Sequence, residues 1–190
     1  MKKNSTRQYI LASKSPRRQQ LLAEAGYEFE VRTKSVEENY RSNLHYSEVP
    51  GYLATKKAKA IFPEIDQEII IASDTIVVCE EEILGKPKDY QDAVRMLNIL
   101  SGKEHHVITG VCLMDKKKEV IFSDTTSVRF KALTSEEINY YINEFQPYDK
   151  AGGYGIQEWI GMIGINEIRG SYFTVMGLPI QRLYEELNKF

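Results

Sequence analysis

Hydrophobic positions recur with two different spacings along this chain, and the two spacings alternate. Apolar residues three and four positions apart are typical of a helix with one buried face, whereas short apolar runs and strict alternation are typical of strands. The pattern predicts strands over residues 8–12, 27–32, 69–78, 106–114, 119–130 and 163–168. It predicts helices over residues 16–25, 47–62, 89–100, 134–145 and from 178 onward. Strands and helices that alternate in this way indicate an α/β fold with a mixed sheet.

Residue types that favour helix starts support three of these boundaries. Ser15 offers an N-cap, and Pro16 follows it at the first helical position. Asp89 precedes the helix predicted over residues 89–100 and can cap it. Thr134 and Glu137 have the spacing of a capping box, in which side chain and main chain of the two residues bond reciprocally.

Composition narrows the class of protein. The chain has 190 residues, 42% of them hydrophobic and 27% charged, which is typical of one globular domain over residues 1–190. Its 25 basic and 27 acidic residues give a net charge of -2, which counts against a general binder of nucleic acid or of anionic membranes. No apolar run has the length of a membrane span, and the N-terminus lacks the apolar segment of a secretory signal. We therefore expect a soluble cytoplasmic protein, and its two cysteines, Cys79 and Cys112, fit neither a disulfide framework nor a metal-binding spacing.

Cations and hydroxyls gather where the first strand leads into the first helix. The segment Ser13-Lys14-Ser15-Pro16-Arg17-Arg18 contains two serines and three basic residues, and no acidic residue precedes Glu24. The first turn of a helix has unpaired N–H groups and the positive end of the helix dipole, which favour an anion. The segment predicts a phosphate site, and the alternative is a capped helix whose arginines are merely solvated.

A carboxylate interrupts the most apolar strand. Asp74 lies between the β-branched runs 69–72 and 76–78, which predict a central strand buried on both faces. A buried ionised carboxylate is costly unless it meets a cation or a metal, and carboxylates also orient attacking water. The alternative is an aspartate at a strand end that bonds to a neighbouring turn. Glu37 and Glu38 follow the second strand and can supply another carboxylate, although adjacent acids in a loop are usually solvated.

Lysines and glycines mark three further segments. Lys56, Lys57 and Lys59 lie on one helix flank, where a solvated basic face is the ordinary interpretation. Lys86 stands between glycine and proline, in a constrained turn that can hold it toward an anion. Residues 148–157 (YDKAGGYGIQ) have three glycines that permit close approach of a ligand, and the amide of Gln157 can read a base edge. The chain contains no Walker A motif, no dinucleotide-binding glycine motif and no motif for serine or cysteine nucleophiles.

These segments together resemble the Maf family of nucleoside triphosphate pyrophosphatases. The matching stretches follow the family order across nearly the whole chain: LASKSPRRQQLL (11–22), LATKKAKA (53–60), SDTIVV (73–78), GKP (85–87), LSG (100–102), YDKAGGYGIQ (148–157) and VMGLP (175–179). The resemblance implies an α/β fold with a bent mixed sheet, flanked by helices, around a central cleft. It also implies hydrolysis of a nucleoside triphosphate to the monophosphate and pyrophosphate with a divalent metal, Mg²⁺ or Mn²⁺.

The resemblance also assigns roles to individual residues. Asp74 would accept the proton of the attacking water, and Glu38, Lys57 and Lys86 would complete the catalytic and metal–phosphate set. Glu38 and Asp74 would bind the metal. The remaining positions carried over are the anion cradle, Ser13, Ser15 and Arg18, and the base-selecting residues, Arg17, Thr75 and Gln157.

The base-selecting positions resemble the branch of the family that prefers dTTP and UTP. Glu158 and Trp159 depart from the family, which often has glycine after the glutamine, and Ser73 stands where alanine is frequent. Two alternatives stay open: a pyrophosphatase for modified or other nucleotides, and a nucleotide-sensing regulator of cell division without turnover. We expect no membrane or nucleic-acid partner, and dimers reported for the family suggest a homodimer.

Overall fold

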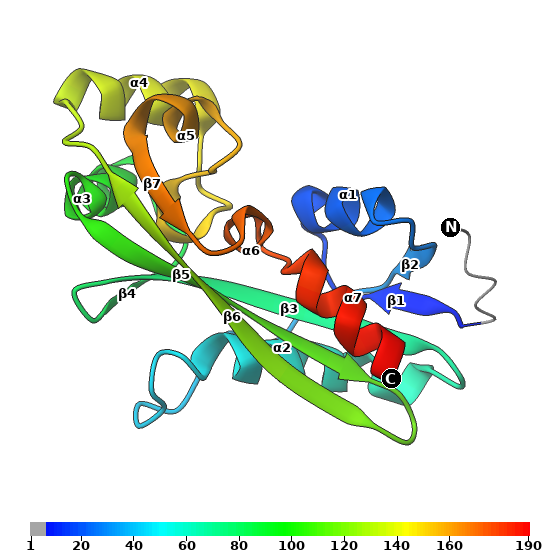
Figure 1. Ribbon diagram of the computed structural model, residues 1–190. Coiled ribbons are helices and arrows are strands. Elements are labelled where there is room, and N and C mark those ends of the chain that lie inside the picture. Colours follow the sequence, from blue (N-terminus) through cyan, green and yellow to red (C-terminus); the bar gives the residue numbers. More distant parts are fainter. Residues whose placement is uncertain (1–6) are drawn as a thin grey trace. The chain divides into compact units, whose positions relative to one another are not determined.

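The structure, a computed structural model, describes residues 7–190 (Figure 1). Its strands are β1 (Tyr9–Leu11), β2 (Phe29–Val31), β3 (Ile69–Cys79), β4 (Glu82–Leu84), β5 (Glu104–Met114), β6 (Glu119–Phe130) and β7 (Ile165–Arg169). Its α-helices are α1 (Pro16–Glu24), α2 (Val49–Ile61), α3 (Tyr90–Leu100), α4 (Ser135–Phe145), α5 (Trp159–Gly164), α6 (Tyr172–Met176) and α7 (Ile180–Lys189). Two short 3₁₀ turns complete the elements, η1 (Phe62–Glu64) and η2 (Ala151–Gly153).

The seven strands form one mixed sheet, as predicted. Its order is β2-β1-β3-β5-β6-β7, and β4 pairs with β3. The strand β1 is parallel to both β2 and β3, while β4 is antiparallel to β3 and β7 is antiparallel to β6. Parallel neighbours need a crossover, and α1 provides it between β1 and β2. The predicted α/β fold is confirmed.

The described part of the chain forms two compact units. Of the described residues, the first unit comprises 7–74, 109–124 and 177–190, and the second comprises 75–108 and 125–176. The strands β3, β5 and β6 contribute residues to both units. The single domain expected for residues 1–190 and the central cleft implied by the resemblance stay predictions.

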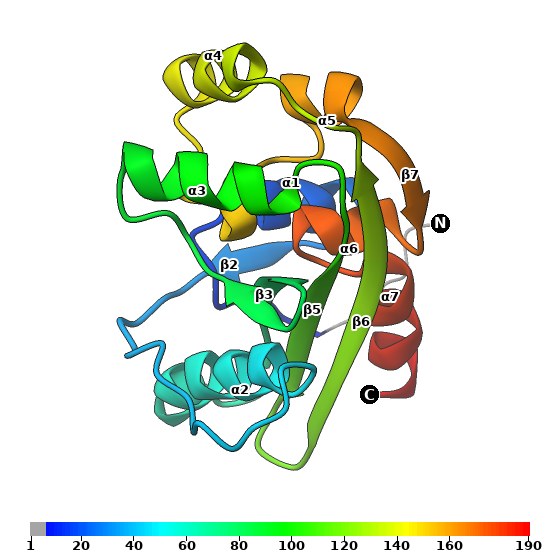
Figure 2. The same ribbon diagram turned by 90° about the vertical axis from the view of Figure 1, so that its left-hand side faces the viewer.

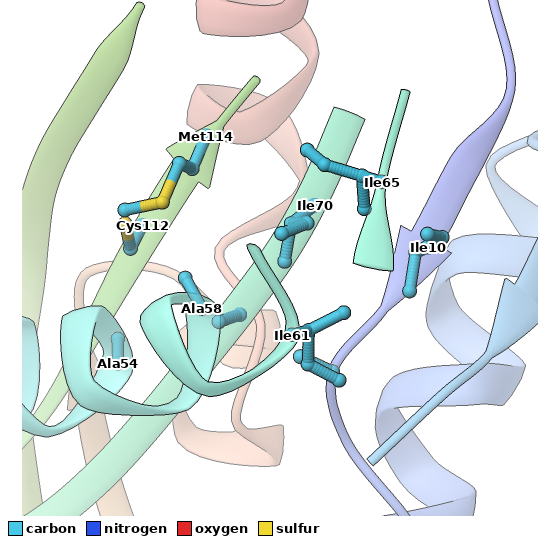
Figure 3. Close-up of a cluster of buried hydrophobic side chains, with 10 residues drawn as sticks. Ile10, Ala54, Ala58, Ile61, Ile65, Ile70, Cys112 and Met114 are labelled. Carbon is cyan, nitrogen blue, oxygen red and sulfur yellow. The ribbon is translucent and has the colours of Figure 1, made fainter. Parts of the chain in front are cut away.

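The core of the first unit lies between α2 and the sheet. Figure 3 shows Ala54 and Ala58 of α2 facing Ile70 of β3 and Cys112 of β5, with Ile10 of β1 close by. All five residues are at most 1% exposed. Small alanines on the contacting face let the helix axis approach the strands closely.

One glycine sets the distance between α2 and β5. A Cβ atom added to Gly110 would lie 2.2 Å from the main-chain nitrogen of Gly51 and 2.3 Å from the carbonyl carbon of Pro50. Both neighbours are main-chain atoms in the first turn of α2, so no side-chain rotation can relieve the overlap. The start of α2 therefore rests directly on the backbone of β5.

In the second unit, the predicted helix caps are present. The Asp89 side chain accepts a hydrogen bond from the main chain of Asp92, and Thr134 and Glu137 form the complete capping box. The capped helices α3 and α4 lie side by side, as both views show (Figures 1 and 2). The buried face of α3 includes Ala93, Met96 and Leu97, whereas Val94 is only half-buried.

Three elements differ from the sequence predictions. A strand was predicted over residues 163–168. Its first two residues instead form the end of the short helix α5, and β7 starts at Ile165. Gly161 and Gly164 lower helix propensity in α5, so its pattern did not indicate a helix. The helix α6 and the hairpin strand β4 were missed. In that hairpin, Glu80 and Glu81 have positive φ angles of 50° and 68°. Asparagine or glycine usually occupies such positions, so the sequence did not indicate a tight turn here.

A buried histidine belongs to the core of the second unit. The His105 ring is 1% exposed, its Nε2 lies 2.8 Å from the hydroxyl of Tyr154, and it packs edge-on against Phe130. Burial, with a smaller contribution from the neighbouring His106, lowers the pKa of His105 to about 3. The ring is therefore neutral in the folded protein at neutral pH. Among residues 7–190, no helix combines the length and the apolar character needed to cross a membrane.

The close contact at Gly110 predicts a large stability loss for a small change. We expect Gly110→Ala to lower the free energy of unfolding by about 2 kcal/mol or more, because main-chain atoms must move to admit the methyl group. Gly85→Ala is the matched control, since a Cβ atom there meets nothing within 4 Å. Urea denaturation measures both variants. Equal stabilities would show that α2 is not held against β5 in this way.

The buried His105 predicts a pH-dependent stability. Below about pH 6.5 the unfolded chain protonates this histidine, whereas the folded chain does so only near pH 3, so stability falls as the pH falls through that window. His105→Gln removes the titration. Its stability relative to the unmodified protein should improve by roughly 1.5 kcal/mol between pH 6.5 and pH 5. Denaturation at the two pH values measures this, with the exposed His45→Gln as control. A constant difference between His105→Gln and the unmodified protein would contradict the prediction.

Candidate active site

Three charged side chains meet beside β3 in the first unit. The Nζ atom of Lys57 lies 2.9 Å from Oε1 of Glu38 and also forms an ion pair with Oδ1 of Asp74. The side chains are 47% exposed for Glu38, 16% for Lys57 and 12% for Asp74. The cluster therefore joins one carboxylate at the surface to one that is nearly buried, through a single ammonium group.

The positions of Asp74 and Lys57 follow from the strand and the helix that carry them. Alternate residues of a strand share a face, so Asp74 continues the face of β3 that carries Ile70 and Ala72. Both of those residues belong to the core cluster beneath α2, as does Ala58, the neighbour of Lys57. A basic side chain on α2 and an acidic side chain on β3 thus meet at one end of an apolar interface. Lys57 offsets the cost of burying the Asp74 carboxylate.

The chemistry of the donors allows a divalent cation under one condition. Among residues 7–190, no group of three or more His, Cys, Asp or Glu side chains is arranged to hold a metal ion. Mg²⁺ beside phosphates is usually held by one or two carboxylates, with phosphate oxygens and water completing its shell. Glu38 and Asp74 fit that pattern when a bound phosphate supplies the remaining oxygens.

Arg18 points into the first unit and binds oxygen atoms of three segments. Its Nε donates to the carbonyl of Gly177 at 2.8 Å, and its Nη1 donates to the carbonyl of Ser73 at 2.9 Å and to Oγ of Ser13 at 3.3 Å. Burial lowers the pKa of Arg18, and the negative charge of Asp74 opposes that effect. Three predicted residues, Ser13, Arg18 and Asp74, are thereby brought together, and Arg18 also ties the start of α1 to β3.

The start of α1 differs in one detail from the predicted cap. Ser15 is the N-cap residue, but its side chain makes no capping hydrogen bond. Its main-chain N–H instead donates to Oγ of the buried Ser13 at 3.2 Å. The first turn of α1 contains no acidic residue, and Arg17 there is half-buried. The positive end of this helix therefore has no carboxylate of its own.

In the second unit, the predicted segments around Lys86 and Gln157 pack together. The main-chain N–H of Gly152 donates to the carbonyl of Gly85 at 2.9 Å, directly before the exposed Lys86. A Cβ atom at Gly153 would lie 3.1 Å from the ring of Pro87. Gly152 and Gly153 both have φ angles of 70°, which only glycine adopts readily. The glycines thus allow residues 151–153 to lie against the Gly-Lys-Pro turn.

The same glycine-rich segment lies on the face of β3 that carries Thr75. A Cβ atom at Gly152 would come within 2.9 Å of the Val77 side chain. Thr75 is two residues from Val77 and so shares its face, which is the opposite face from that of Asp74. Gln157, at the end of the segment, is exposed. Thr75 therefore shares the face of β3 that the start of the glycine-rich segment covers, whereas Gln157 lies five residues further along the chain.

Glu158, the departure from the family pattern, has its side chain turned inward. One carboxylate oxygen accepts a hydrogen bond from the hydroxyl of Tyr141, and the other lies 3.1 Å from Nζ of Lys150. The Lys150 side chain is 9% exposed, and the Tyr141 hydroxyl accepts a bond from the N–H of Gly155 at 3.0 Å. These bonds fix both ends of the segment that precedes Gln157. The sequence marked Glu158 only as a departure from the family and did not predict this supporting role, because no local spacing links it to Tyr141.

Comparison with known proteins finds close relatives over almost the full chain. A protein of Parabacteroides distasonis is 50% identical over 183 residues, which cover 95% of each chain, and one of Phocaeicola vulgatus is 52% identical over 182 residues, covering 95% of this chain and 94% of the other. A protein of Cytophaga hutchinsonii is 51% identical over 180 residues, covering 95% of this chain and 83% of the other. All three are named dTTP/UTP pyrophosphatase.

Solved structures with a similar fold include two distant proteins. The Ham1 protein of Staphylococcus aureus has a TM-score of 0.54 and 14% identity, and covers 95% of this chain and 100% of its own. The HAM1 protein of Coxiella burnetii has a TM-score of 0.52 and 13% identity, and covers 97% of this chain and 100% of its own. At this identity the likeness concerns the fold alone, and it agrees with the α/β class predicted from the sequence.

The family model described as "Maf-like protein" matches residues 8–190, so it spans every segment described above. Motifs 11–22, 53–60 and 73–78 contribute residues to the group in the first unit, and motifs 85–87 and 148–157 form the group in the second. On this match and on the full-length relatives, the chain belongs to the Maf family.

Proposed function

We propose that this protein is a nucleoside triphosphate pyrophosphatase that hydrolyses the α–β phosphoanhydride of dTTP and UTP to the monophosphate and pyrophosphate. The observation that carries the proposal is the cluster of Glu38, Lys57 and Asp74, in a chain about half identical to proteins named dTTP/UTP pyrophosphatase. Hydrolysis of an anhydride requires neutralisation of phosphate charge and a positioned water more than a covalent intermediate. The cluster supplies a cation and two carboxylates for these tasks.

The proposed step uses Asp74 as proton acceptor. Water forms a bond to the α-phosphorus, and a proton of the water passes to Asp74. The bond from the α-phosphorus to the α–β bridging oxygen breaks, and pyrophosphate leaves with that oxygen. Lys57 contacts Oδ1 of Asp74, and a carboxylate has a second oxygen that can accept a proton. Lys57 and Lys86 would offset the negative charge that develops on the phosphates, while Ser13, Ser15 and Arg18 would hold them.

Glu38 and Asp74 are the residues proposed to hold a divalent cation, Mg²⁺ or Mn²⁺. When bound, such an ion supplies charge neutralisation on the phosphate oxygens. The base would be selected by Arg17, Thr75 and Gln157. We also propose a cytoplasmic location, where free nucleotides are the substrates, and a homodimeric assembly without nucleic acid as partner.

Two other functions give different outcomes in one assay. Pyrophosphate release is measured from a panel of normal and modified nucleoside triphosphates, with Mg²⁺, with Mn²⁺ and after chelation. Turnover of dTTP and UTP that is lost on chelation supports the proposal. Turnover confined to purine or modified nucleotides supports the same hydrolysis reaction but a different base preference. Nucleotide binding without any turnover supports a sensor and refutes the enzyme.

The role of Asp74 as proton acceptor predicts a large effect from an isosteric change. Asp74→Asn should lower kcat at least about 100-fold, because the amide cannot accept the proton from water. The change should leave the fold intact, as judged by circular dichroism. Asp66→Asn, at an exposed loop position, controls for the loss of a carboxylate elsewhere. Turnover of Asp74→Asn within a few-fold of normal would remove Asp74 from the mechanism.

Base selection by Gln157 predicts a change in substrate ranking rather than in chemistry. Gln157→Ala should lower the preference for dTTP and UTP over purine triphosphates about tenfold, the size expected for one lost polar contact. The kcat for the best substrate should stay within about threefold, because the amide does not take part in proton transfer. Gln91→Ala, on the exposed side of α3, is the control. An unchanged ranking counts against the role of Gln157.

A further inference from the structure

Lys56 binds the main chain on both sides of Glu38. Its Nζ atom donates to the carbonyl of Glu37 at 2.7 Å, to the carbonyl of Asn39 at 3.1 Å and to the side-chain oxygen of Asn39 at 2.5 Å. An ammonium group has three N–H donors, and here each has an acceptor. The side chain that the sequence suggested was part of a solvated basic face is thus engaged with one short stretch of backbone.

The stretch that Lys56 binds is part of a loop. Residues 32–48, between β2 and α2, contain no helix or strand. Within it, the Asn39 amide donates to the carboxylate of Glu37 at 2.8 Å, which braces the turn around Glu38. Glu37, Glu38 and Asn39 are themselves exposed, so packing against the core does not fix their positions.

Lys56 and Lys57 therefore act on the same loop at different points. Lys57 contacts the carboxylate of Glu38 at 2.9 Å, while Lys56 contacts the carbonyls that flank it. Both lysines project from α2, whose position is fixed by the buried Ala54 and Ala58. The rigid helix thereby sets where the exposed loop can place its carboxylate.

We infer that Lys56 is a positioning residue: it holds the main chain around Glu38 so that the Glu38 carboxylate stays beside Lys57 and Asp74. This inference deepens the proposed function, in which Glu38 and Asp74 hold the divalent cation. Without Lys56, the loop samples other conformations, and only a fraction of the molecules present Glu38 correctly. An apparent dissociation constant rises in inverse proportion to that fraction, whereas saturation with the ion restores the competent state.

The kinetic test compares three variants on α2. Lys56→Met keeps the apolar stem and removes the donors, and it should raise the Mn²⁺ concentration for half-maximal rate about tenfold with kcat within about threefold. Lys56→Arg should recover most of the loss, because a guanidinium can donate to the same carbonyls. Lys59→Met is the matched control, since Lys59 is exposed and its ion pair partner, at 4.0 Å, is Glu119 of β6. A fall in kcat without a change in Mn²⁺ dependence would overturn the inference.

A second measurement needs no catalysis. Hydrogen exchange of the amides in residues 33–46 should be faster in Lys56→Met than in the unmodified protein and in Lys59→Met. Unchanged exchange would overturn the inference, as would faster exchange with normal Mn²⁺ dependence, because Lys56 would then order the loop without positioning Glu38. If the unmodified protein hydrolyses no nucleotide, the proposed function is refuted, but the inference about Lys56 can still be tested. Mn²⁺ binding followed by electron paramagnetic resonance then replaces the rate, and equal affinities in the unmodified protein and Lys56→Met would refute the inference.

Discussion

The burial of one carboxylate is the constraint on which the candidate site depends. On its face of β3, Asp74 lies between the buried apolar side chains of Ala72 and Ile76, so its charge needs a partner inside the protein. Lys57 is that partner, and it reaches Asp74 only because α2 packs closely on the sheet. Gly110 permits that approach by leaving room for the main chain of Gly51. The packing of small residues thus determines the electrostatics of the site.

Some side chains in or beside the candidate site also hold segments of the fold in place. Arg18 was expected to bind phosphate, yet it also bonds to carbonyls of β3 and of the segment before α7. Glu158 supports the glycine-rich segment through its contacts with Tyr141 and the buried Lys150. Each of these side chains positions a segment that carries candidate residues. Variants at these positions therefore report on structure as well as on any role in binding.

Sequence patterns predicted most of the helices and strands, because each of these elements depends on interactions between residues close together in the sequence. Apolar spacing and caps located α2, α3 and α4, and the β-branched run located β3. The patterns failed where the usual residues are absent. Glu80 and Glu81 form a tight turn without asparagine or glycine, and α5 forms although it contains two glycines. Lys56 was taken as solvated, since no local spacing links it to Asn39.

The sequence by itself determined the α/β class, the family, and the set of residues that can carry phosphate chemistry. Only the tertiary structure decided which of them meet: Glu38, Lys57 and Asp74 in one unit, and the glycine-rich segment against the Gly-Lys-Pro turn in the other. The physical reason is the range of the interactions. Helix caps and apolar periods act over a few residues, whereas an ion pair between a helix and a strand depends on how the whole core packs.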